Sequence, residues 1–125
     1  MASLDSALKD AMSIDGAIGV ALVDYDSGMA LGTLSDGSSD LDLNVAAAAN
    51  TDLVRAKMRT MQMLNLHDNE IEDMLISLTT QYHLIRPLTM PNGRGLFLYL
   101  ALNRARANMA MARHQLRLIE AGLEL

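Results

Sequence analysis

The 125 residues of this chain fit one domain, and half of them are hydrophobic, which is enough to build a packed core. The absence of cysteine excludes a disulfide framework and thiolate metal sites. A net charge of −5 argues against general nucleic-acid binding through a basic surface, and three tyrosines, one phenylalanine and no tryptophan leave little to stack on bases.

The sequence also bears on targeting. The first ten residues, MASLDSALKD, carry acidic side chains and lack a basic segment followed by a long apolar run, so we expect no signal peptide. No window reaches the roughly 18 uninterrupted apolar residues of a transmembrane helix. Together with the lack of cysteine, these features favour a cytoplasmic protein that does not insert into membranes.

Three elements are predicted in the first part of the chain. Residues 3–14 form an amphipathic helix that Ser3 caps. Asp15-Gly16 ends this helix. Residues 17–24 and 29–35 then form two strands.

The first of these strands is apolar on both faces, which requires packing partners on both. Alternation places its large side chains on one face, namely Ile18, Val20 and Leu22. It places its small side chains mainly on the other face, where a helix can approach the backbone closely. These small residues are Ala17, Gly19 and Ala21.

The connection between the two strands contains Asp24, Asp26 and Ser27, a combination that also occurs in catalytic sites. Asp and Ser start type I turns by bonding to their own backbone, and Gly28 can take the positive φ that closes a short hairpin. A nucleophilic serine needs a general base, and no histidine lies nearby in the sequence. We therefore interpret these residues as a turn, with a histidine brought close by folding as the catalytic alternative.

A long helix is predicted over residues 41–64, with Asp40 or Asp42 as its N-cap and a run of alanines that favours helix. Its apolar residues form two stripes. The first contains Leu43, Ala47, Val54, Met58 and Met61. The second contains Ala46, Ala49, Leu53, Ala56 and Met63. One stripe is enough to pack on a sheet, so the second predicts contact with something else, such as a second subunit.

Three strands, over residues 70–78, 82–88 and 96–102, and a final helix over 103–121 complete the chain. Asn92-Gly93 predicts a type I′ turn before the last strand. The inner face of the last helix is predicted to contain Ala105, Met109, Ala112, Leu116 and Ile119. The order α-β-β-α-β-β-β-α indicates an α+β fold in which helices cover both faces of one antiparallel sheet.

No pattern of catalytic or metal-binding residues stands out. His67, His83 and His114 share no metal-ligand spacing. Gly93 and Gly95 lack the GK[ST] ending of a phosphate-binding loop. The ten methionines suit either core filling or an adaptable binding surface. The sequence therefore predicts no catalytic residue, no metal site and no cofactor.

The arrangement of these elements resembles the roadblock/LC7 family over residues 3–121. The resemblance rests jointly on GVALVDYDSGMAL, the alanine-rich helix, IEDMLISLTTQYHLIRPL and GLFLYLALNRARANMAMAR. QYHLIRPL looks like bacterial members, which often sit beside small Ras-like GTPases and sensor kinases. The resemblance implies one domain with a profilin-like, five-stranded antiparallel sheet.

The same resemblance implies a homodimer in which the second helices pack together and the third strands pair into one continuous sheet. It also implies a non-enzymatic regulator or adaptor of a small Ras-like GTPase, with an associated sensor kinase as another partner. For eukaryotic relatives it implies a dynein-type adaptor light chain.

Candidate interaction residues follow from this expectation. The candidates for the dimer interface are Leu53, Val54, Met58, Met61, Met74 and Ile76, although those on the helix can instead face their own sheet. The candidates for partner binding are Arg55, Arg59 and Gln62, which a dimer would present twice as a positive ridge on an acidic protein. Ordinary solvated charges are the alternative interpretation.

Two further function classes remain open at this level. A small-molecule sensor is the first alternative, because related sheets hold small molecules. It requires a cavity lined by apolar groups with a few convergent polar ones, whereas the continuous apolar sequence favours a filled interior. An enzyme is the third interpretation.

Overall fold

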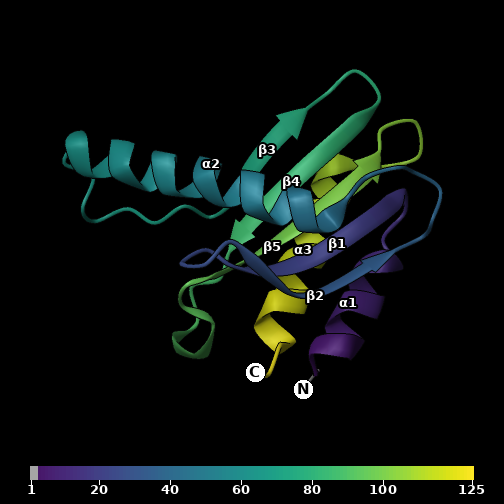
Figure 1. Ribbon diagram of the computed structural model, residues 1–125, viewed down its shortest axis with the longest axis horizontal. Helices are drawn as coiled ribbons and strands as arrows, with labels where there is room; N and C mark the ends of the chain where they lie inside the picture. Colours follow the sequence, from purple (N-terminus) through teal and green to yellow (C-terminus); the bar gives the residue numbers. More distant parts are fainter. Residues whose placement is uncertain (1–2) are drawn as a thin grey trace.

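The computed structural model describes residues 3–125 and shows one antiparallel sheet of five strands with helices on both of its faces (Figure 1). The predicted element order is confirmed. The elements are α1 (Leu4–Met12), β1 (Ala17–Asp24), β2 (Met29–Ser35), α2 (Leu43–Met63), β3 (Met74–Ser77), β4 (Gln81–Pro87), the short 3-10 helix η1 (Pro91–Gly93), β5 (Leu96–Asn103) and α3 (Met109–Gly122).

The strands lie in the order β2-β1-β5-β4-β3, so β5 is central and β2 and β3 form the two edges. The continuous apolar run of β5 suits this central position, because helices pack on both of its faces. Within residues 3–125, each edge strand pairs with one neighbour only. The sheet therefore offers two edges to other chains, one at each side.

The helices form two layers around this sheet. Helices α1 and α3 cover one face, where Leu8 and Leu116 meet Val20 and Leu98. Helix α2 crosses the opposite face, where Val54 packs in the cluster that contains the other inward side chains of β1 and β5 (Figure 1). This arrangement confirms that both faces of the first strand are covered. No helix within residues 3–125 is long and apolar enough to cross a membrane.

A β-bulge in β1 corrects the predicted face of Ile18. Ala17 and Gly19 pair with the consecutive residues Leu102 and Ala101, so Ile18 is an extra residue in the ladder. It packs on the α2 face, whereas Val20 and Leu22 pack on the opposite face together with Ala17. An extra residue reverses the alternation of the strand on one side of the bulge, and this is why strict period-2 reasoning fails here.

A second irregularity lies in the edge strand β2. Leu22 and Val23 of β1 pair with Gly32 and Ala30, so the intervening Leu31 has no counterpart in the ladder. The side chain of Leu31 is exposed. Bulges of this kind bend an edge strand and increase its twist.

The last helix begins later than predicted. Strand β5 continues to Asn103 and a turn follows, so α3 starts at Met109, where the Asn108 side chain accepts a hydrogen bond from the backbone N–H of Met111. Ala105 therefore lies outside the helix and is exposed, which makes its assignment to the inner face wrong. The rest of the predicted inner face packs on the sheet as expected.

Two other boundaries also differ from the prediction. Strand β3 is shorter than expected, because only residues 74–77 pair with β4. The predicted type I′ turn at Asn92-Gly93 is wrong: residues 91–93 form a turn of 3-10 helix, and the positive φ falls at Gly95. The fixed φ of Pro91 suits the first position of a helical turn, and this outweighs the Asn-Gly signal.

Candidate interaction surface and cleft

The turn after β1 has the geometry expected from its sequence. The backbone N–H of Asp26 donates to Asp24 Oδ1 at 2.9 Å, and the N–H of Met29 donates to Ser27 Oγ at 3.2 Å. Gly28 has a φ of 76°. Ser27 is exposed and forms no hydrogen bond to a histidine within the described chain. These side chains therefore build a turn, as predicted.

The N-terminus of α2 is fixed by Asp42, which settles the choice between two predicted caps. Its Oδ1 accepts hydrogen bonds from the backbone N–H groups of Asn44 at 3.0 Å and Val45 at 3.2 Å. Asp40 is exposed and lies outside the helix. Capping satisfies two N–H groups that have no partner inside the helix, and it sets the direction in which α2 crosses the sheet.

The first stripe of α2 packs on the sheet of its own chain. Leu43, Ala47 and Val54 are buried there, and Met58 packs against the same cluster. Val54 has no exposed surface. For Val54 the structure therefore favours the alternative that the sequence left open, because the chain's own sheet already covers this side chain completely.

The second stripe of α2 is open to solvent. Leu53 is 39% exposed and Met63 is 75% exposed, while Ala49 and Ala56 are exposed between them. Only Ala46, at the start of this stripe, packs against the cluster under the helix. Exposed apolar side chains that follow one helix face mark a surface for a partner.

The C-terminal half of α2 extends beyond the strands, and the segment that follows it runs back toward β3 (Figure 1). After Val54 the helix contains no fully buried residue, and only Met58 and Met61 are half-buried. Leu64 and Leu66, directly after the helix, are exposed. This overhanging half of the helix is therefore supported on one side only.

Strand β3, which forms one edge of the sheet, contributes side chains to the cluster under α2. Met74 and Ile76 point to the α2 face and are half-buried against its cluster. Leu75 lies on the other face and is exposed. The side of β3 that faces away from β4 has no strand partner in the part of the chain that the structure describes.

The predicted partner-binding side chains lie on one face of α2. Arg55, Arg59 and Gln62 are all exposed. Neither arginine forms an ion pair with another residue in the range 3–125. Gln62 differs from the arginines because it also lines a cleft under the overhanging helix.

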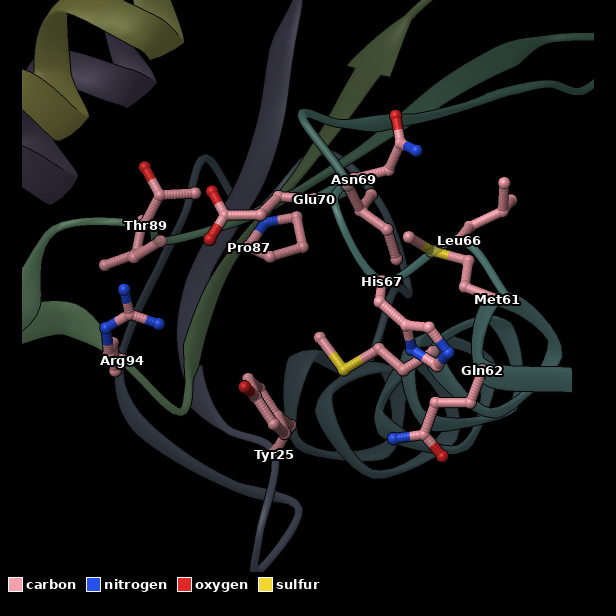
Figure 2. A pocket seen from close by; sticks show the side chains of 13 residues that line it. Tyr25, Met61, Gln62, Leu66, His67, Asn69, Glu70, Pro87, Thr89 and Arg94 are labelled. Carbon is pink, nitrogen blue, oxygen red and sulfur yellow. The ribbon is translucent and has the colours of Figure 1, made fainter. Parts of the chain in front are cut away.

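This cleft has a volume of about 470 Å³ and lies between α2 and one end of the sheet (Figure 2). The α2 side of the cleft contributes Met58, Met61, Gln62, Leu66 and His67. The segment before β3 contributes Asn69, Glu70 and Ile71. The ends of the strands contribute Tyr25, Pro87, Leu88, Thr89 and Arg94.

The sequence did not predict this cleft. Of its lining residues, only Met58, Met61 and Gln62 were singled out, and these as candidates for protein interfaces. A partial signal is present in the topology. Strands β1 and β4 run in the same direction, because both pair antiparallel with β5, so Tyr25 and Thr89 follow strands that end at the same side of the sheet. The contribution of α2 is not visible in the sequence, because it depends on how far the helix extends past the sheet.

The sheet side of the cleft is held in place by a buried ionic network. Glu120 of α3 is buried, and its carboxylate accepts a hydrogen bond from Arg86 and another from the backbone N–H of Thr89 at 3.0 Å. The guanidinium of Arg113 donates to both oxygens of Asp73 at 2.8 and 3.1 Å. This pairing raises the pKa of Arg113 further above its usual value.

The network connects segments that are distant in the sequence. Arg86 lies in β4 and also approaches Asp73 at 4.0 Å, so it joins the acidic groups on either side of it. Asp73 immediately precedes β3, and Thr89 follows β4 in the cleft wall. The ionic contacts thereby fix both the cleft wall and the approach to the edge strand.

A separate group of polar side chains, formed by Tyr99, His83 and Gln81, lies on the α2 face of the sheet. The Tyr99 hydroxyl is 3.2 Å from Nδ1 of His83, and Nε2 of His83 is 2.8 Å from Gln81 Oε1. Burial raises the pKa of Tyr99 to about 12 and lowers the pKa of His83. A neutral His83 with its proton on Nε2 satisfies both hydrogen bonds.

Within residues 3–125, no three His, Asp or Glu side chains gather as metal ligands would. The exposed features are instead an apolar helix stripe, a strand edge, the side chains of Arg55 and Arg59 on α2, and a cleft. Such a combination suits binding of another molecule through surface complementarity.

Comparison with solved structures identifies the architecture. A roadblock/LC7 domain from Streptomyces avermitilis matches with a TM-score of 0.74 and 14% identity over 96% of this chain and 93% of that one. MglB of Myxococcus xanthus matches with a TM-score of 0.72 and 15% identity over 92% and 83%. MglC of the same organism matches with a TM-score of 0.54 and 24% identity over 94% and 90%.

Sequence comparison alone does not reach these proteins. No protein-family model matches the chain, and no curated protein matches it. The structural similarity nevertheless covers nearly the whole chain and includes the element order and the five-stranded sheet. The chain therefore has the roadblock/LC7 fold.

Proposed function

We propose that this chain is a non-enzymatic, homodimeric interaction module that regulates or recruits a small Ras-like GTPase in the cytoplasm. The observation that supports the proposal most is the combination of an exposed apolar stripe on α2 with the free edge of β3. A GTPase as the partner follows from the roadblock/LC7 resemblance, with an associated sensor kinase as a further partner.

The dimer is proposed to form through α2 and β3. Leu53 and the half-buried Met58, Met61, Met74 and Ile76 remain candidates for its interface. Pairing β3 with β3 of a second copy across a two-fold axis would satisfy the free backbone groups of both strands at once. The same contact would cover apolar surface on α2 that the monomer leaves in water.

The partner is proposed to meet the outward face of α2, where Arg55, Arg59 and Gln62 are exposed. Unpaired arginines on a protein with a net charge of −5 form a local site of opposite sign, which can steer an acidic surface into place. Charges at the rim of an interface act mainly on the association rate.

A capture experiment tests this proposal. The intact wild-type protein and the Arg55→Glu/Arg59→Glu variant serve as baits in cell extract, and captured proteins are assayed for GTP binding. We expect the wild type to retain a GTP-binding protein and the variant to bind it more slowly, with a weaker dependence of the rate on salt.

A matched control reverses two exposed charges on the opposite layer, Lys9→Glu and Arg117→Glu. The control should bind the partner as fast as the wild type. The proposal is wrong if no GTP-binding protein is retained by the wild type. The ridge is not the docking surface if a dimeric Arg55→Glu/Arg59→Glu variant binds with an unchanged rate at every salt concentration.

A small-molecule sensor is the second candidate function, and the cleft is the observation that favours it. Its volume of about 470 Å³ and its mixture of apolar and polar lining residues meet the requirement for a ligand site. The exposed stripe of α2 lies on a different face of the helix from the cleft, whereas Met58, Met61 and Gln62 belong both to the cleft and to the proposed interaction surfaces.

A further inference from the structure

The cleft under α2 combines one fixed wall with one adaptable wall. On the sheet side, the backbone N–H of Tyr25 donates to the carbonyl of Gly95 at 3.0 Å, and Thr89 is held by Glu120. On the other side, Met58 and Met61 extend from the overhanging part of α2. Methionine side chains adjust to a ligand at low cost, whereas the fixed wall can supply orientation.

Two side chains of opposite charge line the same cleft. Glu70 and Arg94 are both exposed, and neither forms an ion pair with another residue between 3 and 125. In Figure 2 the Glu70 carboxylate and the Arg94 guanidinium lie toward Thr89, while Met61, Leu66 and His67 come from the opposite side. The cleft thus has a polar side with both signs of charge and a largely apolar side.

This distribution of charge limits what the cleft can hold. A simple anion would pair with Arg94 and leave Glu70 without a partner, and a simple cation would do the reverse. A purely apolar ligand would form no polar contact with either side chain. A ligand that carries an anionic group and a cationic group close together satisfies both side chains.

We infer that the cleft binds a zwitterionic amino acid with a large aliphatic side chain. Its carboxylate pairs with Arg94, its ammonium group pairs with Glu70, and its side chain packs against Met58, Met61 and Leu66. This inference concerns the free protein and does not rest on the proposed GTPase partner.

A titration of the isotope-labelled protein with L-leucine, followed by NMR chemical shifts, tests the inference. We expect saturable shifts in residues that line the cleft. N-acetyl-L-leucine lacks the ammonium group and L-leucinamide lacks the carboxylate, so each should bind about tenfold or more weakly. Glycine retains both charges but has no aliphatic side chain, and it should bind more weakly for that reason.

Variants assign each charge to its partner. Arg94→Met should weaken binding of L-leucine about tenfold but change binding of L-leucinamide little, because that ligand has no carboxylate to lose. Glu70→Gln should weaken binding of L-leucine but change binding of N-acetyl-L-leucine little. Arg117→Met and Glu124→Gln remove exposed charges outside the cleft and serve as matched controls with unchanged binding.

Three results would overturn the inference. The first is the absence of shifts in the cleft at about 10 mM L-leucine, a concentration at which a ligand with a dissociation constant of about 1 mM fills most of its sites. The second is equal binding of L-leucine and its two blocked analogues. The third is an equal effect of the cleft variants and the control variants. None of these results bears on capture of a GTP-binding protein, so this inference and the proposed function can fail separately.

Discussion

At the scale of single residues, His83 and Tyr99 show how the sheet keeps polar groups under α2. The two rings meet edge to face with centroids 5.3 Å apart, and His83 also bonds to Gln81. A charged imidazole is disfavoured at this position, because burial lowers the pKa of His83 below the ordinary value of 6.5. The protein therefore carries a pH-dependent contribution to its stability.

We expect the contribution of His83 to stability to be fully present above pH 6.5 and to fall as the pH drops through the lowered pKa of the folded state. In that window the unfolded chain binds a proton that the folded chain does not, so acid favours unfolding. Urea unfolding at pH 7.5 and pH 5 should show a smaller loss on acidification for His83→Gln than for the wild type. His114→Gln, an exposed control, should follow the wild type, and an identical loss in all three proteins would contradict this expectation.

Glu120 is a second residue whose removal should be costly. The change Glu120→Ala leaves the guanidinium of Arg86 with only its longer contact to Asp73, and it leaves the N–H of Thr89 without an acceptor. Breaking a buried pair in this way costs about 3–5 kcal/mol. Chemical denaturation should show this loss for Glu120→Ala and almost none for the exposed Glu124→Ala. A loss for Glu120→Ala of less than about 1 kcal/mol would mean that water replaces the missing carboxylate.

At the scale of elements, α2 connects most of the features described. Its cap sets its direction, its first stripe fastens it to the sheet, and its second half forms one side of the cleft. We expect Asp42→Ala to lower the free energy of unfolding by about 1 kcal/mol, because two backbone N–H groups lose their acceptor. Asp40→Ala is the matched control and should have little effect in the same thermal or urea unfolding measurement. Equal effects of the two changes would rule out Asp42 as the cap.

The elements also show what a sequence can and cannot predict. The first stripe of α2 follows from apolar periodicity, and the structure confirms that it packs on the sheet. The central position of β5 suits its continuous apolar run. The face on which Ile18 lies cannot be predicted from the sequence, because the bulge depends on how β1 pairs with β5. The late start of α3 cannot be predicted either. Residues 103–108 are compatible with a helix, and only the extension of β5 to Asn103 keeps them out of one. The cleft was missed because it combines segments from Tyr25 to Arg94.

At the scale of the whole molecule, the exposed apolar surface of α2 decides the expected assembly. We expect the wild-type protein to be a dimer at micromolar concentration by light scattering. Leu53→Glu places a charge in the proposed interface and should shift the equilibrium to the monomer. Leu118→Glu makes the same change at an exposed position on α3 and should remain dimeric. A monomeric wild-type protein would contradict the proposed assembly.

The irregular strand β2 has a consequence for solubility. Its sequence, MALGTLS, contains neither a charge nor a proline, so the usual protections of a free edge are missing from residues 29–35. The bulge at Leu31 supplies the protection in their place, because a bent strand is a poor template for further pairing. If two copies join through β3, both ends of the joined sheet are such bent strands. In such a pair the bend at Leu31 would disfavour further edge-to-edge pairing, so that assembly would end at two copies.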